Sequence, residues 1–154
     1  MRATLLKTNK CLETTLALLK PDLFADHQTL CNIEQRIAHL FRISARRKVI
    51  WTTGDAQRFY AEHQGKPFYP RLISYMTSGP ILALALTKHG AIQEWREMIG
   101  STRPAQMRIE RPTTLRAQFG LTDTRNSFHG SDSVASAERE LEFFFGKKLP
   151  NQLH

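Results

Sequence analysis

Short apolar runs and amphipathic stretches alternate along this chain. The apolar runs are bounded by turn signals such as Lys20-Pro21-Asp22 and Ser78-Gly79-Pro80, which is typical of buried strands. The predicted strands cover residues 14–19, 43–52 and 81–87. From Leu30 to Phe41 the apolar residues recur at helical spacing and predict a helix between the first two strands.

The second half of the chain predicts mainly helices. Pro67 suits the first position of one of them. The predicted helices cover residues 55–62, 67–77, 90–100 and 133–145, and a short strand over residues 127–129 precedes the last. The pattern dissolves over residues 101–119, which predicts a long irregular loop, and such a loop inside a compact domain is usually functional.

This order of elements, β-α-β-(αα)-β-α-loop-β-α, follows the split βαβ plan. We therefore predict an α+β, ferredoxin-like fold, in which helices cover a four-stranded antiparallel sheet, with an added helical hairpin and a long loop. A single domain is expected over residues 14–146. A flexible N-terminal segment (1–13) and a C-terminal tail (147–154) are expected on either side of it.

Composition narrows the class of protein. The chain has 154 residues, 41% of them hydrophobic, which is enough for one domain with its own core. Its longest uninterrupted apolar stretch, residues 81–86, is far too short to cross a bilayer, which excludes a membrane-spanning protein. Cys11 and Cys31 form no CxxC pair, which excludes a disulfide scaffold and a cysteine zinc site and indicates a reducing compartment.

The charge balance points to polyanionic partners. A net charge of +8 and a pI near 9.9 favour nucleic acid, an anionic membrane surface or a highly phosphorylated small molecule. The basic segment 42–48 is compatible with nucleic acid but is also typical of a solvated face. Because Arg2, Lys7 and Lys10 precede the first acidic residue, a mitochondrial location is the alternative to the expected cytoplasmic one.

Several common sites are absent from the sequence. It contains no GxGxxG, GxxxxGK[ST], HExxH or GxSxG motif, and its histidines do not pair at helical spacing. What remains is the segment 125–133, in which Gly130 leaves the imidazole of His129 open on one side. Such a histidine can act as a general base or a nucleophile. The alternative is a histidine at a strand–helix junction that is satisfied by a Ser hydroxyl.

Further segments, which follow one another in a fixed order along the chain, favour the reactive interpretation of His129. They are Lys20-Pro21-Asp22, Tyr60, Lys66-Pro67-Phe68, Ser78-Gly79-Pro80, the segment 96–102 (REMIGST), Arg116 and the segment 126–133 (NSFHGSDS). Together they resemble the nucleoside diphosphate kinase family over nearly the whole chain, from residue 14 to about residue 145. The HGSDS signature is highly specific.

The resemblance implies a fold, a reaction and a set of site residues. His129 would be the nucleophile that carries a phosphoryl group from ATP to a nucleoside diphosphate, in a ping-pong reaction. The residues implied in catalysis with His129 are Lys20, Tyr60, Asn126, Ser131 and Glu140. Those implied in nucleotide binding are Lys20, Phe68, Leu72, Arg96, Thr102, Arg116 and Asn126. Mg²⁺ would arrive on the nucleotide phosphates with no dedicated protein ligands, and the protein would form a homo-oligomer.

Two departures from the family pattern bear on this reading. The loop of residues 104–112 is longer than in typical members, and Asp123 and Thr124 stand near the expected base site in place of an apolar residue and a glycine. A weakly active or inactive regulatory protein is therefore the alternative, whereas nucleic acid and membrane partners are not favoured. We also expect Lys20, Arg96 and Arg116 to be exposed charges that act on phosphate and contribute little to folding.

Overall fold

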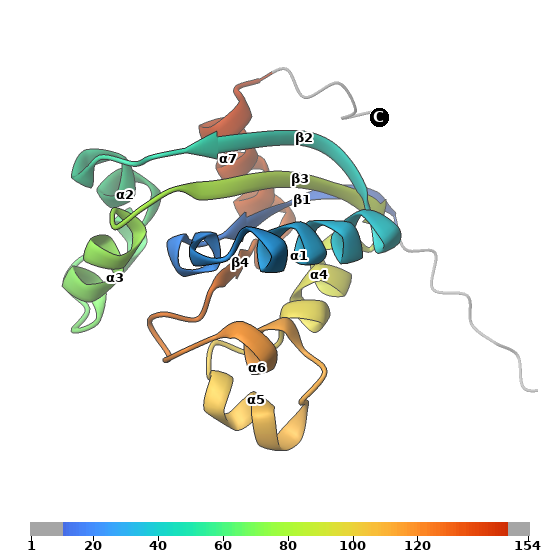
Figure 1. Cartoon of the computed structure of the whole chain (residues 1–154). Helices are drawn as coiled ribbons and strands as arrows, with labels where there is room; N and C mark the ends of the chain where they lie inside the picture. Colours follow the sequence, from blue (N-terminus) through green and yellow to red (C-terminus); the bar gives the residue numbers. More distant parts are fainter. Residues whose placement is uncertain (1–10, 148–154) are drawn as a thin grey trace, which may run out of the picture.

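A computed structural model describes residues 11–147 of the chain, and part of the expected N-terminal segment and nearly all of the tail lie outside them. The sheet is antiparallel, with its four strands in the order β2-β3-β1-β4 (Figure 1). The strands are β1 (Leu12–Leu19), β2 (Arg42–Val49), β3 (Ile81–His89) and β4 (Phe128–Gly130). The predicted α+β, ferredoxin-like fold is confirmed.

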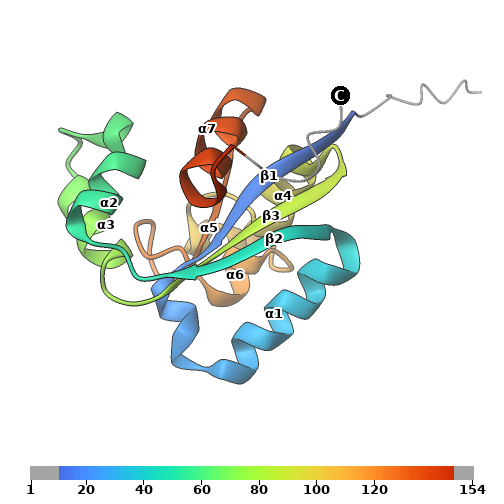
Figure 2. The same ribbon diagram turned by 90° about the horizontal axis from the view of Figure 1, so that it is seen from above.

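Helices cover both faces of the sheet (Figure 2). They are α1 (His27–Leu40), α2 (Thr53–Phe59), α3 (Tyr69–Met76), α4 (Ala91–Ile99), α5 (Pro104–Glu110), α6 (Leu115–Phe119) and α7 (Val134–Phe145), with short 3₁₀ turns at Pro21–Ala25 and Ala61–His63. Helices α1 and α4 pack on one face of the sheet, and α7 with the α2–α3 hairpin packs on the other. Among the described residues, no helix is both long and apolar enough to cross a bilayer.

Burial on both faces explains why the central strands have no polar side. In β3, Ile81, Ala83 and Ala85 face α7 and the α2–α3 hairpin, whereas the leucines between them face α1 and α4. Successive side chains of a strand point to opposite faces, so a strand covered on both sides is a continuous apolar run. The small alanines leave room for the large aromatic side chains on the α7 face.

The predicted long loop over residues 101–119 is wrong, because it contains two short helices. Pro104 lies at the start of α5, where its missing N–H is not needed, and the Thr114 hydroxyl caps α6 by accepting from the Ala117 N–H at 3.4 Å. Arg108 ties the helices together by donating from Nε to the Ala117 carbonyl at 3.1 Å. Helices this short bury too few apolar residues to show a periodic pattern.

The remaining element boundaries shift by a few residues. The predicted strand 43–52 ends at Val49. Beyond it the chain leaves the sheet, because Trp51 packs within an aromatic cluster, with its ring stacked on that of Phe144 at 5.3 Å between centroids. The hairpin helices are shorter than the predicted 55–62 and 67–77, and α3 has Pro70 rather than Pro67 in its first turn. Tertiary packing and caps set these ends, and sequence periodicity does not resolve them.

The pairing of β4 with β1 places the segment that carries His129. His129 stands opposite Leu18 in the register. Phe128 is buried in the core on the α1–α4 face, so the alternation of the strand turns His129 toward the α7 face. The candidate histidine therefore projects from a sheet that helices cover on both faces.

Candidate active site

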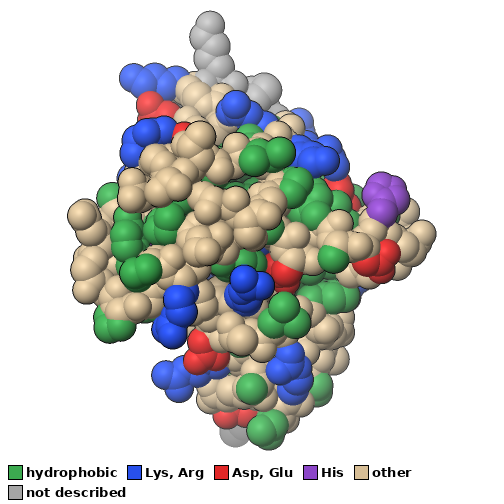
Figure 3. All heavy atoms as spheres, turned by 60° about the vertical axis from the view of Figure 1, so that its left-hand side comes forward, with side chains coloured by type: hydrophobic (Ala, Val, Ile, Leu, Met, Phe, Trp, Pro, Cys, Tyr) green, Lys and Arg blue, Asp and Glu red, His purple; other side chains and the backbone are tan. Residues whose placement is uncertain are grey.

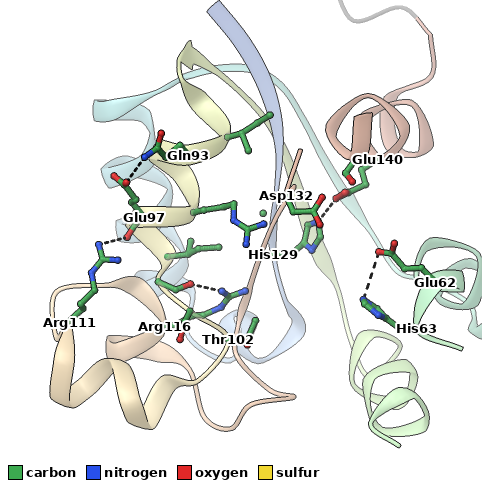
Figure 4. A pocket seen from close by; sticks show the side chains of 17 residues that line it. Glu62, His63, Gln93, Glu97, Thr102, Arg111, Arg116, His129, Asp132 and Glu140 are labelled. Atoms are coloured by element: carbon green, nitrogen blue, oxygen red, sulfur yellow. Dashed lines mark hydrogen bonds and ion pairs between the residues drawn. The ribbon is translucent and has the colours of Figure 1, made fainter. Parts of the chain in front are cut away.

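Three contacts fix the orientation of His129. Its Nε2 is hydrogen-bonded to Oε1 of Glu140, a buried residue of α7 (Figure 4). The Ser131 hydroxyl donates to the same carboxylate oxygen at 3.3 Å, and the indole Nε1 of Trp95 donates to the His129 carbonyl at 2.9 Å. A carboxylate at Nε2 favours the proton on that nitrogen, which leaves the lone pair of Nδ1 available to a ligand.

Aromatic packing confines the ring further. The Phe59 ring meets the imidazole edge-on at 5.4 Å between centroids. Gly130 is required beside it, since a Cβ there would lie 2.7 Å from Cδ1 of Trp95 and would push the indole off the His129 carbonyl. The imidazole is thus pre-positioned, with its side chain 20% exposed.

A pocket of about 750 Å³ opens in front of His129, a size that suits a small-molecule ligand. Figure 4 shows Arg116 and Thr102 on one side of the imidazole, and Glu62 and His63 of the α2–α3 hairpin on the other. The predicted residues on its wall are His129, Arg96, Thr102, Arg116 and Glu140. Arg111 adds a third guanidinium, so the pocket suits an anionic ligand.

Arg116 is not the exposed charge that the sequence analysis expects. Its side chain is buried and donates to two carbonyls, those of Gly100 at 2.6 Å and Phe128 at 2.8 Å. Burial, and then the charge of Arg96, lower the pKa of Arg116 to about 10. The expectation is wrong here because carbonyls of the α4–α5 turn and of β4 enclose this arginine.

Lys20 is likewise buried, at the end of β1, which contradicts the same expectation. Its Nζ donates to Oδ1 of Asn126 at 3.0 Å. Burial, and then the charge of Arg116, lower the pKa of Lys20 to about 7, although Asp22 acts in the opposite direction. Asn126 is itself held, because its Nδ2 donates to the Asp123 carbonyl at 2.9 Å. Arg96 alone of the three cations is exposed.

The other predicted residues lie behind or beside the pocket wall. Leu72 is buried in the core, and Tyr60 is buried with a hydroxyl that has no hydrogen-bond partner within residues 11–147. Burial, and then the charge of Glu140, raise the pKa of Tyr60, so its hydroxyl stays protonated. Phe68 is half-buried, and its ring packs edge-on against His63 at 5.4 Å. Asp123 lines a separate hollow.

The structure also places residues at the site that the sequence analysis did not select. His63 and Glu62 line the pocket from the hairpin, and Asp132 lines it beside His129. Burial lowers the pKa of His63 below its usual value. A signal for His63 existed, since it lies three residues after Tyr60 and therefore on the same turn; its ring stacks on Tyr60 at 5.9 Å.

The side chains that line the pocket suit the phosphate groups of a ligand that carries its own metal ion. Among residues 11–147 no group of three His, Cys, Asp or Glu residues is arranged to hold a metal. The guanidinium groups of Arg96, Arg111 and Arg116 instead suit phosphate oxygens, on which Mg²⁺ is commonly carried. This donor set is compatible with a nucleotide-bound Mg²⁺.

Comparison with known proteins shows the family to which the chain belongs. The nucleoside diphosphate kinase family model matches residues 13–149. The chain belongs to the nucleoside diphosphate kinase family. It is 47% identical over 144 residues to nucleoside diphosphate kinase 6 of Homo sapiens, covering 93% of this chain and 77% of that protein. The expected family resemblance is confirmed, and the similarity to this sixth member is extensive.

Two further relatives show how widely the likeness extends. The chain is 41% identical to a nucleoside diphosphate kinase of Pasteurella multocida (strain Pm70), over 86% of this chain and 94% of that one. The crystal structure of the Aquifex aeolicus nucleoside diphosphate kinase matches with a TM-score of 0.82 at 36% identity, over 86% of this chain and 94% of that chain. The family membership supports a nucleotide kinase function.

We predict that replacing Arg116 lowers the stability of the fold much more than replacing Arg96. Arg116→Ala leaves two buried carbonyls without donors, which lowers the free energy of unfolding by about 2–4 kcal/mol. Arg96→Ala changes it by less than about 1 kcal/mol, because exposed charges contribute little. Urea denaturation of the two variants and the wild type measures both values. Equal, small changes would show that the Arg116 carbonyl contacts do not support the fold.

We predict that ADP binding takes up a proton at Lys20. At pH 8 an amine of pKa about 7 is mostly neutral, and phosphate oxygens beside it raise its pKa, so binding takes up about 0.9 proton. At pH 6 the amine is already charged and uptake is small. Calorimetry in buffers of different ionisation enthalpy measures the uptake. It should vanish in Lys20→Gln and persist in Lys48→Gln, whose residue is exposed on β2; uptake that persists in Lys20→Gln would contradict the prediction.

Proposed function

We propose that this protein is an active nucleoside diphosphate kinase that transfers the γ-phosphoryl group of ATP to a nucleoside diphosphate through a phosphohistidine on His129. The observation that carries the proposal is the Glu140–His129 pair facing a pocket lined with guanidinium groups. A histidine that served only as a structural residue would need no cationic pocket in front of it.

The proposed reaction has two halves at one nitrogen. Nδ1 of His129 attacks the γ-phosphorus of ATP, an N–P bond forms, and the bond to the bridging oxygen breaks as ADP leaves. A terminal phosphate oxygen of a nucleoside diphosphate then attacks the phosphohistidine, and the N–P bond breaks to regenerate the free imidazole. Glu140 stabilises the positive charge that develops on the ring while Nδ1 carries the phosphoryl group.

Fixed positive charge serves the transition state of each half. In phosphoryl transfer the negative charge is spread over the equatorial oxygens, so groups already in place stabilise it without reorganising. Arg116 is held by two carbonyls and Lys20 by Asn126, and both are therefore pre-positioned. Arg96, Thr102 and Tyr60 would add donors to the phosphates or ribose. Mg²⁺ bound to the nucleotide would neutralise part of the phosphate charge.

Base recognition is proposed to rest on stacking. Phe68, with Leu72 beside it, would contact the face of the base. Stacking of this kind hardly distinguishes one base from another, because every base has a π-face. Slack base selectivity follows from this. Asp123, which lines a hollow together with Arg71 and Arg125, is the group proposed to add a hydrogen bond to a base edge.

The burial of the cations favours this proposal over a regulatory protein without activity. Keeping Lys20 and Arg116 out of water is unfavourable unless a ligand or partner offsets it. A module that only bound partners would have no use for two buried charges at this place. The nucleic acid alternative has less support, because on the face seen in Figure 3 the Lys and Arg side chains are scattered among acidic and apolar ones.

Assembly and location belong to the same proposal. A homo-oligomer is expected, as is typical of the family, although the sequence pattern indicates a longer segment over residues 104–112 than in typical members. We propose a cytoplasmic location, with the mitochondrion as the alternative.

We predict that incubation with γ-labelled ATP and Mg²⁺ yields a phosphoprotein whose label is lost in acid and kept in base. His129→Asn should abolish the label, because an amide cannot accept the phosphoryl group. His89→Asn, which alters an imidazole at the far end of β3, serves as the matched control and should label normally. Undiminished labelling of His129→Asn, or a label that survives acid, would refute the proposed function.

A further inference from the structure

Ser127 has a backbone conformation that its residue type rarely adopts. Among residues 11–147 it is the one non-glycine residue in the left-handed region, with φ at 72°. It is also completely buried, on the loop that leads into β4 (Figure 1). Such a conformation persists only where surrounding contacts hold it, and it is commonly found at functional sites.

Each polar group of Ser127 is used to hold it. The hydroxyl donates to Oδ2 of Asp22, and the amide N–H donates to the Tyr75 hydroxyl at 3.3 Å. The Ser127 carbonyl accepts from the backbone N–H of Lys20 at 2.9 Å. The residue is therefore bound to the turn after β1 and to helix α3 at the same time.

Asp22 closes this arrangement into a loop of contacts. Its other oxygen, Oδ1, accepts from the Tyr75 hydroxyl. Burial and the hydrogen bond to Asp22 raise the pKa of Tyr75, so the hydroxyl remains a donor. The ring of Tyr75 in turn contacts the Lys20 ammonium at 5.7 Å and the Arg125 guanidinium at 5.5 Å from its centroid. Ser127, Asp22 and Tyr75 thus form one hydrogen-bonded group, the tether, which lies next to the backbone and side chain of Lys20.

We infer that Ser127 is a positioning residue for phosphoryl transfer, acting through Asn126 and Lys20; this inference rests on the proposed function. The residue before it, Asn126, accepts from Lys20 Nζ, and the carbonyl of the residue after it, Phe128, accepts from Arg116. The backbone angle at Ser127 therefore sets how far the two buried cations stand from the ligand.

His129 lies two residues further on and has its own supports. Glu140, Ser131 and Trp95 hold it independently of Ser127. Loss of the tether should therefore displace the cations and leave the nucleophile intact. This difference separates a positioning role from a general loss of structure.

The test uses Ser127→Gly, which tolerates the left-handed backbone but has no hydroxyl to bind Asp22. Ser44→Ala is the matched control, since it removes a hydroxyl that contacts Thr87 at 2.6 Å within the sheet, away from the pocket. His129 is labelled in two ways: by ATP, which needs the cations, and by the small donor phosphoramidate, which needs only the imidazole. Mass spectrometry of the peptide that contains His129 gives both rates.

We expect labelling by ATP to slow by about 10- to 100-fold in Ser127→Gly, a size typical of small misplacements at a reaction centre. Labelling by phosphoramidate should change less than about twofold, and Ser44→Ala should match the wild type with both donors. An unchanged ATP rate in folded Ser127→Gly would overturn the inference. A parallel fall with both donors would also overturn it, because the role would then be structural.

A third readout keeps the inference separate from the proposed function. Wild-type protein that phosphoramidate labels and ATP does not would refute the proposed function alone. Amide hydrogen exchange of the free protein then tests the tether: faster exchange confined to residues 18–22 and 120–130 in Ser127→Gly supports it. Exchange that is unchanged there, or faster throughout the chain, overturns it.

Discussion

Two buried cations with little negative charge near them are the constraint on which the rest of this site depends. Burial lowers the pKa of both Lys20 and Arg116, and each lies almost wholly out of water. The charge of Arg116 lowers the pKa of Lys20 further, and that of Arg96 lowers the pKa of Arg116. Neutral dipoles hold them, from the carbonyls of Gly100 and Phe128 and the amide of Asn126. In the proposed function a phosphate group supplies the missing negative charge, so that ligand binding offsets the unfavourable burial of these cations.

The fold determines where these groups meet. β4 is three residues long, yet its pairing with β1 brings the end of one strand, which carries Lys20, beside the strand that carries His129. Helix α7 then delivers Glu140 to the imidazole from one face of the sheet, and Trp95 of α4 holds the His129 carbonyl from the other. The proposed nucleophile therefore stands on rigid elements, while α4, the α2–α3 hairpin and the α5–α6 segment form the walls of the pocket.

The sequence was sufficient to predict the sheet and to select His129 as the candidate nucleophile, since apolar runs and the HGSDS signature are local features. It did not predict helices α5 and α6, because two short helices flanked by prolines bury too few apolar residues to produce a period. Nor did it predict the burial of Lys20 and Arg116. Arg116 is held by backbone carbonyls 16 and 12 positions away, and Lys20 by an amide 106 positions away. Such contacts leave no mark on residue type.

The left-handed backbone of Ser127 could not be predicted either. Glycine and asparagine adopt that conformation often and would have indicated it, whereas serine adopts it rarely. What stabilises it is a carboxylate 105 positions away along the chain. Sites built from such distant contacts become visible only when the fold brings the segments together. This is why the residues of the pocket could be proposed from a family pattern while their physical roles could not.

The most direct test of the account is a two-step transfer in which donor and acceptor are never present together. Protein treated with ATP and Mg²⁺ is freed of all nucleotide by gel filtration, and GDP is then added alone. Because a phosphoryl group carried on His129 stays on the protein between the two steps, the account predicts that up to one GTP forms per protein molecule. GTP that forms only when ATP and GDP are present together would contradict a phosphohistidine carrier.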